Sequence, residues 1–151
     1  MDKEFKRAVH QACEKRLEEK IVALLNEIDA LKESASNETK SSMGDKYETG
    51  REMIMQERNK LGEQLDQFKK QQVILSSVNM DMNYNSVKAG SLVQAQNGTF
   101  YISVPIGELN VEGDKVFAIS PLAPLSNAMM GLKRGEVFNL KGGSFEIEEL
   151  I

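Results

Sequence analysis

The sequence has 151 residues, of which 40% are hydrophobic and 28% are charged, with one Cys and no Trp. This length suits one compact domain or two small ones and excludes a large multidomain enzyme. The net charge of −4, with only six Phe and three Tyr, argues against a protein that mainly binds naked nucleic acid. Since there is no long apolar run, no signal peptide and a single Cys13, we expect a cytoplasmic protein that does not enter a membrane.

Charged residues and turn-forming residues are distributed unevenly along the chain. Of the 19 Lys and Arg residues, 14 precede residue 79, whereas eight of the 11 glycines and all three prolines follow it. A charged segment with few glycines and no proline is typical of long helices, while Gly and Pro mark the turns of a β-rich domain. We therefore predict two domains, residues 1–78 and residues 79–151.

Apolar residues in the first domain form two seams with the spacing of a coiled coil. The first seam comprises Leu17, Ile21, Leu24, Ile28, Leu31 and Ala35, continued upstream by Phe5, Val9 and Cys13, and the second comprises Ile54, Leu61, Leu65, Phe68, Gln72 and Leu75. The small polar residues between the seams, at 34–44, favour turns over helix interiors. The pattern predicts an antiparallel coiled-coil hairpin with its tip at about residues 36–45.

The second domain shows the pattern of a small β-sheet. Two apolar segments, 91–96 and 99–104, flank Asn97-Gly98, which is a strong hairpin signal. Further strands are expected at 115–120, 136–140 and 144–151, and a short helix is expected within 124–132. The whole chain is therefore predicted to be α+β, with a helical hairpin followed by a small antiparallel sheet and one short helix.

Three stretches of the sequence are similar to a known family. Residues 119–138 (ISPLAPLSNAMMGLKRGEVF), 143–151 (GSFEIEELI) and 45–52 (DKYETGRE) resemble the bacterial Gre transcript-cleavage elongation factors, in the same order along the chain. The resemblance implies a coiled coil that enters the secondary channel of RNA polymerase and an FKBP-like domain that docks at the rim of that channel. It implies a monomer that binds RNA polymerase and meets nascent RNA and DNA only indirectly, within the elongation complex.

The chain departs from the family at the tip of the hairpin. In the family, two acidic residues there help to hold a catalytic Mg²⁺, and the polymerase then hydrolyses its own backtracked RNA. Counted from Tyr47, these positions fall on Lys40 and Met43, neither of which binds Mg²⁺. Glu38 and Asp45 are nearby acids that would act as substitute ligands only with a loop register shifted by two residues. In the alternative interpretation, Asp45 or Ser42 caps the second helix.

The resemblance therefore implies polymerase binding and leaves cleavage open. It implies no enzyme activity of the chain's own and no intrinsic cofactor, since any Mg²⁺ would be shared with the polymerase.

The docking segment also differs from the family pattern. The acidic-Ser-Pro tripeptide of the family corresponds to Leu122-Ala123-Pro124, so only Pro124 is retained, and Ser120-Pro121 lies just upstream. The resemblance assigns polymerase docking to Ser120, Pro121, Leu122 and Pro124.

Two other interpretations stay open. A coiled-coil adaptor or chaperone-like protein would use the apolar seam to dimerise, and a peptidyl-prolyl isomerase would need an aromatic-lined cleft in the second domain. His10 and Cys13 could form half of a zinc site, but each is the only residue of its type. We therefore predict that Cys13 lies in the seam and that His10 lies at its edge.

Overall fold

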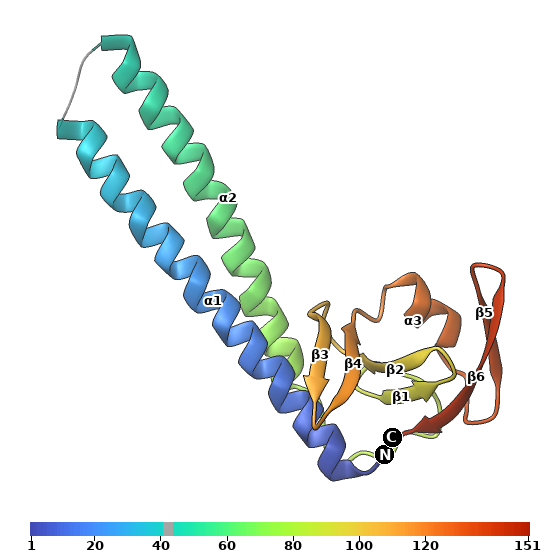
Figure 1. The fold of residues 1–151 in the computed structure, drawn as a ribbon. Helices are drawn as coiled ribbons and strands as arrows, with labels where there is room; N and C mark the ends of the chain where they lie inside the picture. The colour runs from blue at the N-terminus through green and yellow to red at the C-terminus, as the bar shows by residue number, and fades with distance from the viewer. Residues whose placement is uncertain (41–43) are drawn as a thin grey trace. The chain divides into compact units, whose positions relative to one another are not determined.

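The computed structural model describes the backbone of residues 1–40 and 44–151 and the side chains of residues 1–36 and 48–151. Two long helices, α1 (Lys3–Lys40) and α2 (Gly44–Ser76), precede a region of six strands and one short helix (Figure 1). The α+β fold class is thus confirmed. The structure divides into two compact units, a helix-pair unit of Leu17–Gln71 and a sheet unit that combines Met1–Arg16 with Gln72–Ile151. The predicted domain boundary near residue 78 stays a prediction.

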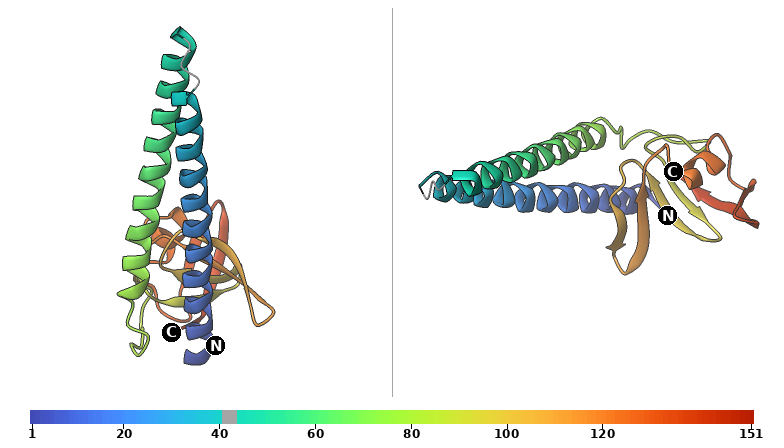
Figure 2. Two further views of the ribbon diagram at one scale, coloured as in Figure 1. Left: turned by 90° about the vertical axis from the view of Figure 1, so that its left-hand side faces the viewer. Right: turned by 90° about the horizontal axis from the view of Figure 1, so that it is seen from above.

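The helix-pair unit is held by the predicted apolar seam. Helices α1 and α2 run antiparallel and side by side, as both views in Figure 2 show. Leu17, Leu24 and Leu61 are buried, whereas most other seam positions are half-buried, as expected for two helices with no third layer. Gln72 is exposed, so its assignment to the seam is wrong. In the described part of the chain, no helix is long and apolar enough to span a bilayer.

The sheet unit contains six strands in the order β3-β4-β2-β1-β6-β5. The strands are β1 (Leu92–Ala95), β2 (Gly98–Ile102), β3 (Gly107–Val111), β4 (Asp114–Ile119), β5 (Val137–Leu140) and β6 (Gly143–Leu150). Every pair is antiparallel except β2 and β4, which pair in parallel. The expectation of a fully antiparallel sheet is therefore wrong at this pair, because the unpredicted strand β3 lies in the connection and forms a hairpin with β4.

The two faces of the sheet pack against different elements. Side chains alternate between the faces of a strand, so Phe100 and Ile102 point one way and Tyr101 points the other. Phe100 and Ile102 belong to a buried cluster that includes Met129 of helix α3 (Pro124–Met129). Tyr101 instead contacts His10 of α1. The first turns of α1 and helix α3 therefore cover opposite faces, which explains why this strand is buried on both sides.

Residues 1–16 join the sheet unit through polar as well as apolar contacts. Val9 and Cys13 are fully buried, as the sequence predicted, although they lie in the sheet unit and not in the helix-pair unit. The carboxylate of Asp2 accepts a hydrogen bond from the amide of Phe5 at 2.8 Å and caps α1. The amino group of Met1 forms an ion pair of 2.7 Å with Glu149 on β6, so the start of α1 is fixed to the sheet.

Candidate docking site

The four residues expected to dock lie in a hydrogen-bonded turn between β4 and α3. The hydroxyl of Ser120 accepts a hydrogen bond from the amide of Leu122 at 3.1 Å, and the carbonyl of Ser120 accepts one from the amide of Ala123 at 3.0 Å. Pro121 and Pro124 restrict the backbone further, because a proline ring fixes φ. The structure thus brings Ser120, Pro121, Leu122 and Pro124 together in one short, ordered segment.

Two side chains of helix α3 hold this turn in place through hydrogen bonds. The hydroxyl of buried Ser126 donates a hydrogen bond of 2.6 Å to the carbonyl of Ser120, and the amide side chain of Asn127 donates one of 3.3 Å to the carbonyl of Leu122. Met129 is fully buried in the core cluster and anchors the helix. Ser126 and Asn127 were not predicted as site residues, although a Ser and an Asn two and three residues after Pro124 are residues that often bond nearby backbone groups.

The turn presents one large apolar side chain to solvent. Leu122 is 84% exposed, the highest value among the described large apolar residues that are exposed. Pro124 beside it is also exposed, and Met130 at the end of α3 is 39% exposed. A leucine held outward on a fixed backbone loses little conformational freedom on binding, because its position is set in advance. This arrangement suits insertion into an apolar pocket of a partner.

The predicted tip residues cannot be placed in a site. Met43 lies outside the described residues, and Glu38, Lys40 and Asp45 lie in helical segments whose side chains are outside the described set. Their assignment as tip residues, and that of Glu38 and Asp45 as metal ligands, stays a prediction. Elsewhere, within the described residues, no three His, Cys, Asp or Glu side chains come together in a way that could hold a metal ion.

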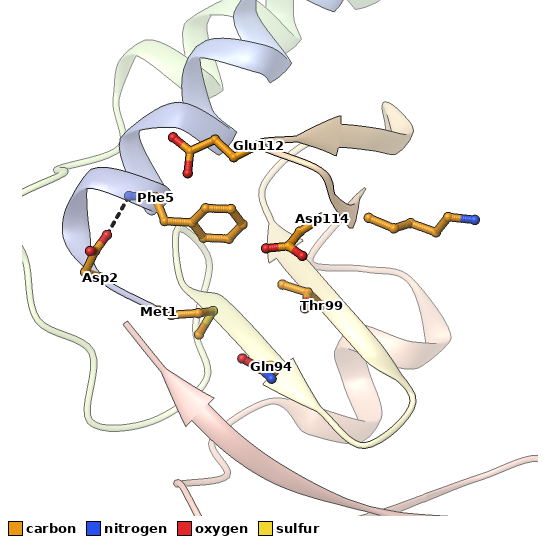
Figure 3. Close-up of a pocket in the computed structure, with 8 residues that line it drawn as sticks. Met1, Asp2, Phe5, Gln94, Thr99, Glu112 and Asp114 are labelled. Carbon is orange, nitrogen blue, oxygen red and sulfur yellow. Dashed lines mark hydrogen bonds between the residues drawn. The ribbon is translucent and has the colours of Figure 1, made fainter.

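A groove of about 400 Å³ lies within the sheet unit, next to the first turn of α1 (Figure 3). The side chains that line it are Met1, Asp2, Phe5, Gln94, Thr99, Glu112, Asp114 and Lys115. Three of them are carboxylates, and Figure 3 shows the Phe5 ring pointing toward Asp114. Glu112 is placed here by the β3–β4 turn, where it has a φ of 55° and is followed by Gly113 at 90°, the backbone of a tight hairpin. This groove could not be predicted from local patterns, because its walls come from four separate segments.

Two polar side chains, His10 and Tyr101, are buried between α1 and the sheet, and the half-exposed Glu14 lies next to His10. The Nδ1 atom of His10 and the hydroxyl of Tyr101 lie 2.7 Å apart, and the Nε2 atom of His10 lies 3.4 Å from a carboxylate oxygen of Glu14. Burial raises the pKa of Tyr101 above its usual value and raises the pKa of the Cys13 thiol to about 12. A thiol with so high a pKa is protonated and unreactive at neutral pH. These groups therefore stabilise the packing of α1, and the two ring nitrogens of His10 lie close to Tyr101 and Glu14.

Comparisons with known proteins give structural neighbours only. No family model matches the chain, and no curated protein matches it. One similar solved structure is GreA factor homolog 1 (Gfh1) of Thermus thermophilus, with 18% identity, coverage of 91% of this chain and 93% of that chain, and a TM-score of 0.36. Another is a structure of the transcription factor Gfh1, with 17% identity, coverage of 92% and 93%, and a TM-score of 0.38.

Proposed function

We propose that this protein is a Gre-type transcription factor that binds RNA polymerase through the turn at residues 120–124 and reaches into the secondary channel with its helix pair. The observation that best supports this is the outward position of Leu122 on a turn fixed by Ser120, Ser126 and Asn127. The Gre resemblance assigns docking to the same turn. The order of the elements, a helical hairpin followed by a sheet with one short helix, also agrees with that resemblance.

The chemistry of the turn defines the kind of contact that we propose. The family has an acidic residue where this chain has Leu122, so the contact would depend on apolar burial more than on charge. Full burial of a leucine side chain contributes about 1.5–3 kcal/mol. The polymerase surface would therefore have to offer an apolar pocket at this position.

Binding to purified RNA polymerase tests the proposal directly. Leu122→Asp should weaken binding by about tenfold or more, because an aspartate cannot be buried in an apolar pocket without a large cost. Since Leu122 is 84% exposed, the substitution should leave the fold intact. Val137→Asp on β5 is the matched control, because Val137 is an exposed apolar residue outside both the docking turn and the helix pair, with 55% of its surface accessible. Equal affinity of the wild type and Leu122→Asp would refute the docking assignment.

We further propose that the protein itself is not a cleavage factor. Lys40 and Met43 stand where the Gre resemblance requires a pair of carboxylates, and neither side chain supplies the oxygen ligands that Mg²⁺ prefers. The protein would then occupy the channel without stimulating RNA hydrolysis, and it would compete with true cleavage factors. The alternative of a dimeric coiled-coil adaptor predicts twice the 16.9 kDa mass of the chain in solution, so a mass measurement separates the two proposals.

A further inference from the structure

Lys6 is a buried cation without a hydrogen-bond partner. Its side chain lies on α1 with 1% of the residue exposed, and its Nζ atom makes no hydrogen bond to any described residue. Among the described residues, the contact that compensates its charge is with the ring of Tyr84, whose centroid lies 4.2 Å from Nζ. An ammonium group has three donors, and an aromatic face replaces only part of the hydration that burial removes.

The Lys6 contact belongs to a larger set that holds residues 77–86, the linker that follows α2. Residues 87–91, which lead into β1, are instead bonded to Ile102, Gly131 and Leu132. Lys3 donates a hydrogen bond of 3.0 Å from Nζ to the carbonyl of Asp81, and Arg7 forms an ion pair of 3.0 Å with the Asp81 carboxylate. Residues three and four apart share a helix face, so one face of α1 binds the linker. The Arg7 and Asp81 side chains are exposed, and such ion pairs contribute little to stability. Most of the attachment must therefore come from the buried part around Lys6 and Tyr84.

The charges around Lys6 do not offset its burial. On its own helix, Lys3 and Arg7 are both cations, and the positive charge of Lys3 adds to the cost of a charged Lys6. On the linker, Asp81 is already engaged with Lys3 and Arg7, and Tyr84 is neutral. On the sheet, the nearby Tyr101 is held by His10. No carboxylate among the described residues pairs with Lys6.

We propose that Lys6 makes the first two turns of α1 and the linker into a latch, a pair of segments that opens locally while the sheet stays folded. A buried cation that lacks a partner lowers the stability of the segments that enclose it, and proteins open first where local stability is lowest. A methionine at this position would fill the same space without the charge. The charge of Lys6 therefore sets how often the linker is released from α1.

Hydrogen exchange of the full-length protein at one neutral pH tests the latch. In Lys6→Met, amides in the first turns of α1 and in residues 77–86 should exchange at least about tenfold more slowly than in the wild type, because removing an uncompensated buried charge stabilises the closed state. The exchange rates of the amides in β1, β2 and β6 should be the same in the variant and the wild type. The matched control Arg7→Met removes an exposed cation from the same face and should leave exchange unchanged or slightly faster. Exchange in Lys6→Met that equals or exceeds the wild-type rate overturns the proposal.

A second variant keeps the proposal testable where Lys6→Met does not fold. Tyr84→Leu removes the ring that faces the ammonium but retains Lys6, so exchange should become faster in the same two segments and nowhere else. A uniform increase over the whole sheet unit would show that these segments do not open separately, and it would refute the latch. No change in either segment would refute it as well.

Discussion

The hydroxyl of Tyr101 lies 2.7 Å from Nδ1 of His10, although the two residues are 91 positions apart in the chain. This hydrogen bond joins the second turn of α1 to a strand in the middle of the sheet, in a region closed to solvent. A buried polar atom that loses its partner costs the full desolvation of that atom. The pair therefore fixes where α1 sits on the sheet, in a way that apolar side chains alone would not.

Removal of the Tyr101 hydroxyl should destabilise the sheet unit. In Tyr101→Phe, Nδ1 of His10 has no partner, and the free energy of unfolding should fall by about 1–3 kcal/mol. Chemical denaturation followed by a signal from the sheet measures this loss. Tyr84→Phe is the control, because it keeps the ring beneath Lys6 and deletes a hydroxyl with no recorded hydrogen bond, so its effect should be small. A loss of equal size in both variants would contradict the role assigned to the His10 contact.

The stability of the sheet unit should depend on pH through Lys6. Burial, with a smaller effect from the charge of Lys3, lowers the pKa of Lys6 from 10.5 to about 8. Below about pH 8 both the folded and unfolded chains hold this proton, and the cost of the buried charge is constant. Above it the folded chain releases the proton while the unfolded chain keeps it to about pH 10.5, so stability rises with pH over that interval.

The comparison with Lys6→Met isolates this effect. Between about pH 7 and about pH 9.5 the wild type should gain about 2 kcal/mol in unfolding free energy relative to Lys6→Met. The raised pKa values of Cys13 and Tyr101 act in the opposite direction at high pH, but they are common to both proteins and cancel in the difference. Parallel pH profiles for the two proteins would show that Lys6 does not titrate in this interval.

Two adjacent leucines on α1 give a direct test of the helix seam. Leu24 is buried, whereas Leu25 is 43% exposed. Leu24→Ala should lower the unfolding free energy of the helix pair by about 2–4 kcal/mol, because it leaves a cavity that only partly collapses. Leu25→Ala should cost less than about 1 kcal/mol, since alanine is a good helix former and little buried surface is lost. Far-ultraviolet circular dichroism during denaturation measures both losses of unfolding free energy. A larger loss in Leu25→Ala than in Leu24→Ala would show that the seam lies on another face of the helix.

The tip prediction depends on the sequence alone. Lys40→Asp together with Met43→Glu should create measurable cleavage of backtracked RNA by polymerase, because two carboxylates are needed to hold Mg²⁺ and orient water. Either substitution by itself should do much less, and the wild type should do little or nothing. The assay is RNA cleavage in halted elongation complexes. Strong cleavage by the wild type that is lost in Glu38→Ala or Asp45→Ala would instead identify those two acids as the working pair.

Local patterns in the sequence predicted most of the elements correctly. The alternating spacing of four and three residues from Leu17 predicted the buried side of α1, and Asn97-Gly98 predicted the β1–β2 hairpin, whose register pairs Ala95 with Gly98. Strand β3 was missed, although Glu108 to Val111 alternates polar and apolar residues before Glu112-Gly113. The run is short, and four residues of alternation are weak support without a neighbouring strand.

The contacts made by residues 1–16 could not have been predicted in the same way. Lys6 reads as one more charged residue on a long helix, yet it is buried against Tyr84. The docking turn was found through the Gre resemblance, whereas its support by Ser126 and Asn127 depends on hydrogen bonds that only the folded chain shows. Periodicity describes which face of a helix is buried, but it does not say which distant segment covers that face.

The sheet unit combines residues that precede the helix pair in the sequence with residues that follow it. This order affects how the chain folds during synthesis. Residues 1–16 are synthesised before the helix pair, whereas the strand that binds His10 and the linker that binds Lys6 are made only after α2. The apolar face around Val9 and Cys13, which is buried in the folded protein, therefore stays exposed until the strands of the sheet have been translated. Early pairing of α1 with α2 would shorten the time for which this face is exposed. The pairing replaces a long flexible loop with a closed hairpin, and it lowers the entropy lost when residues 1–16 join the segment after α2.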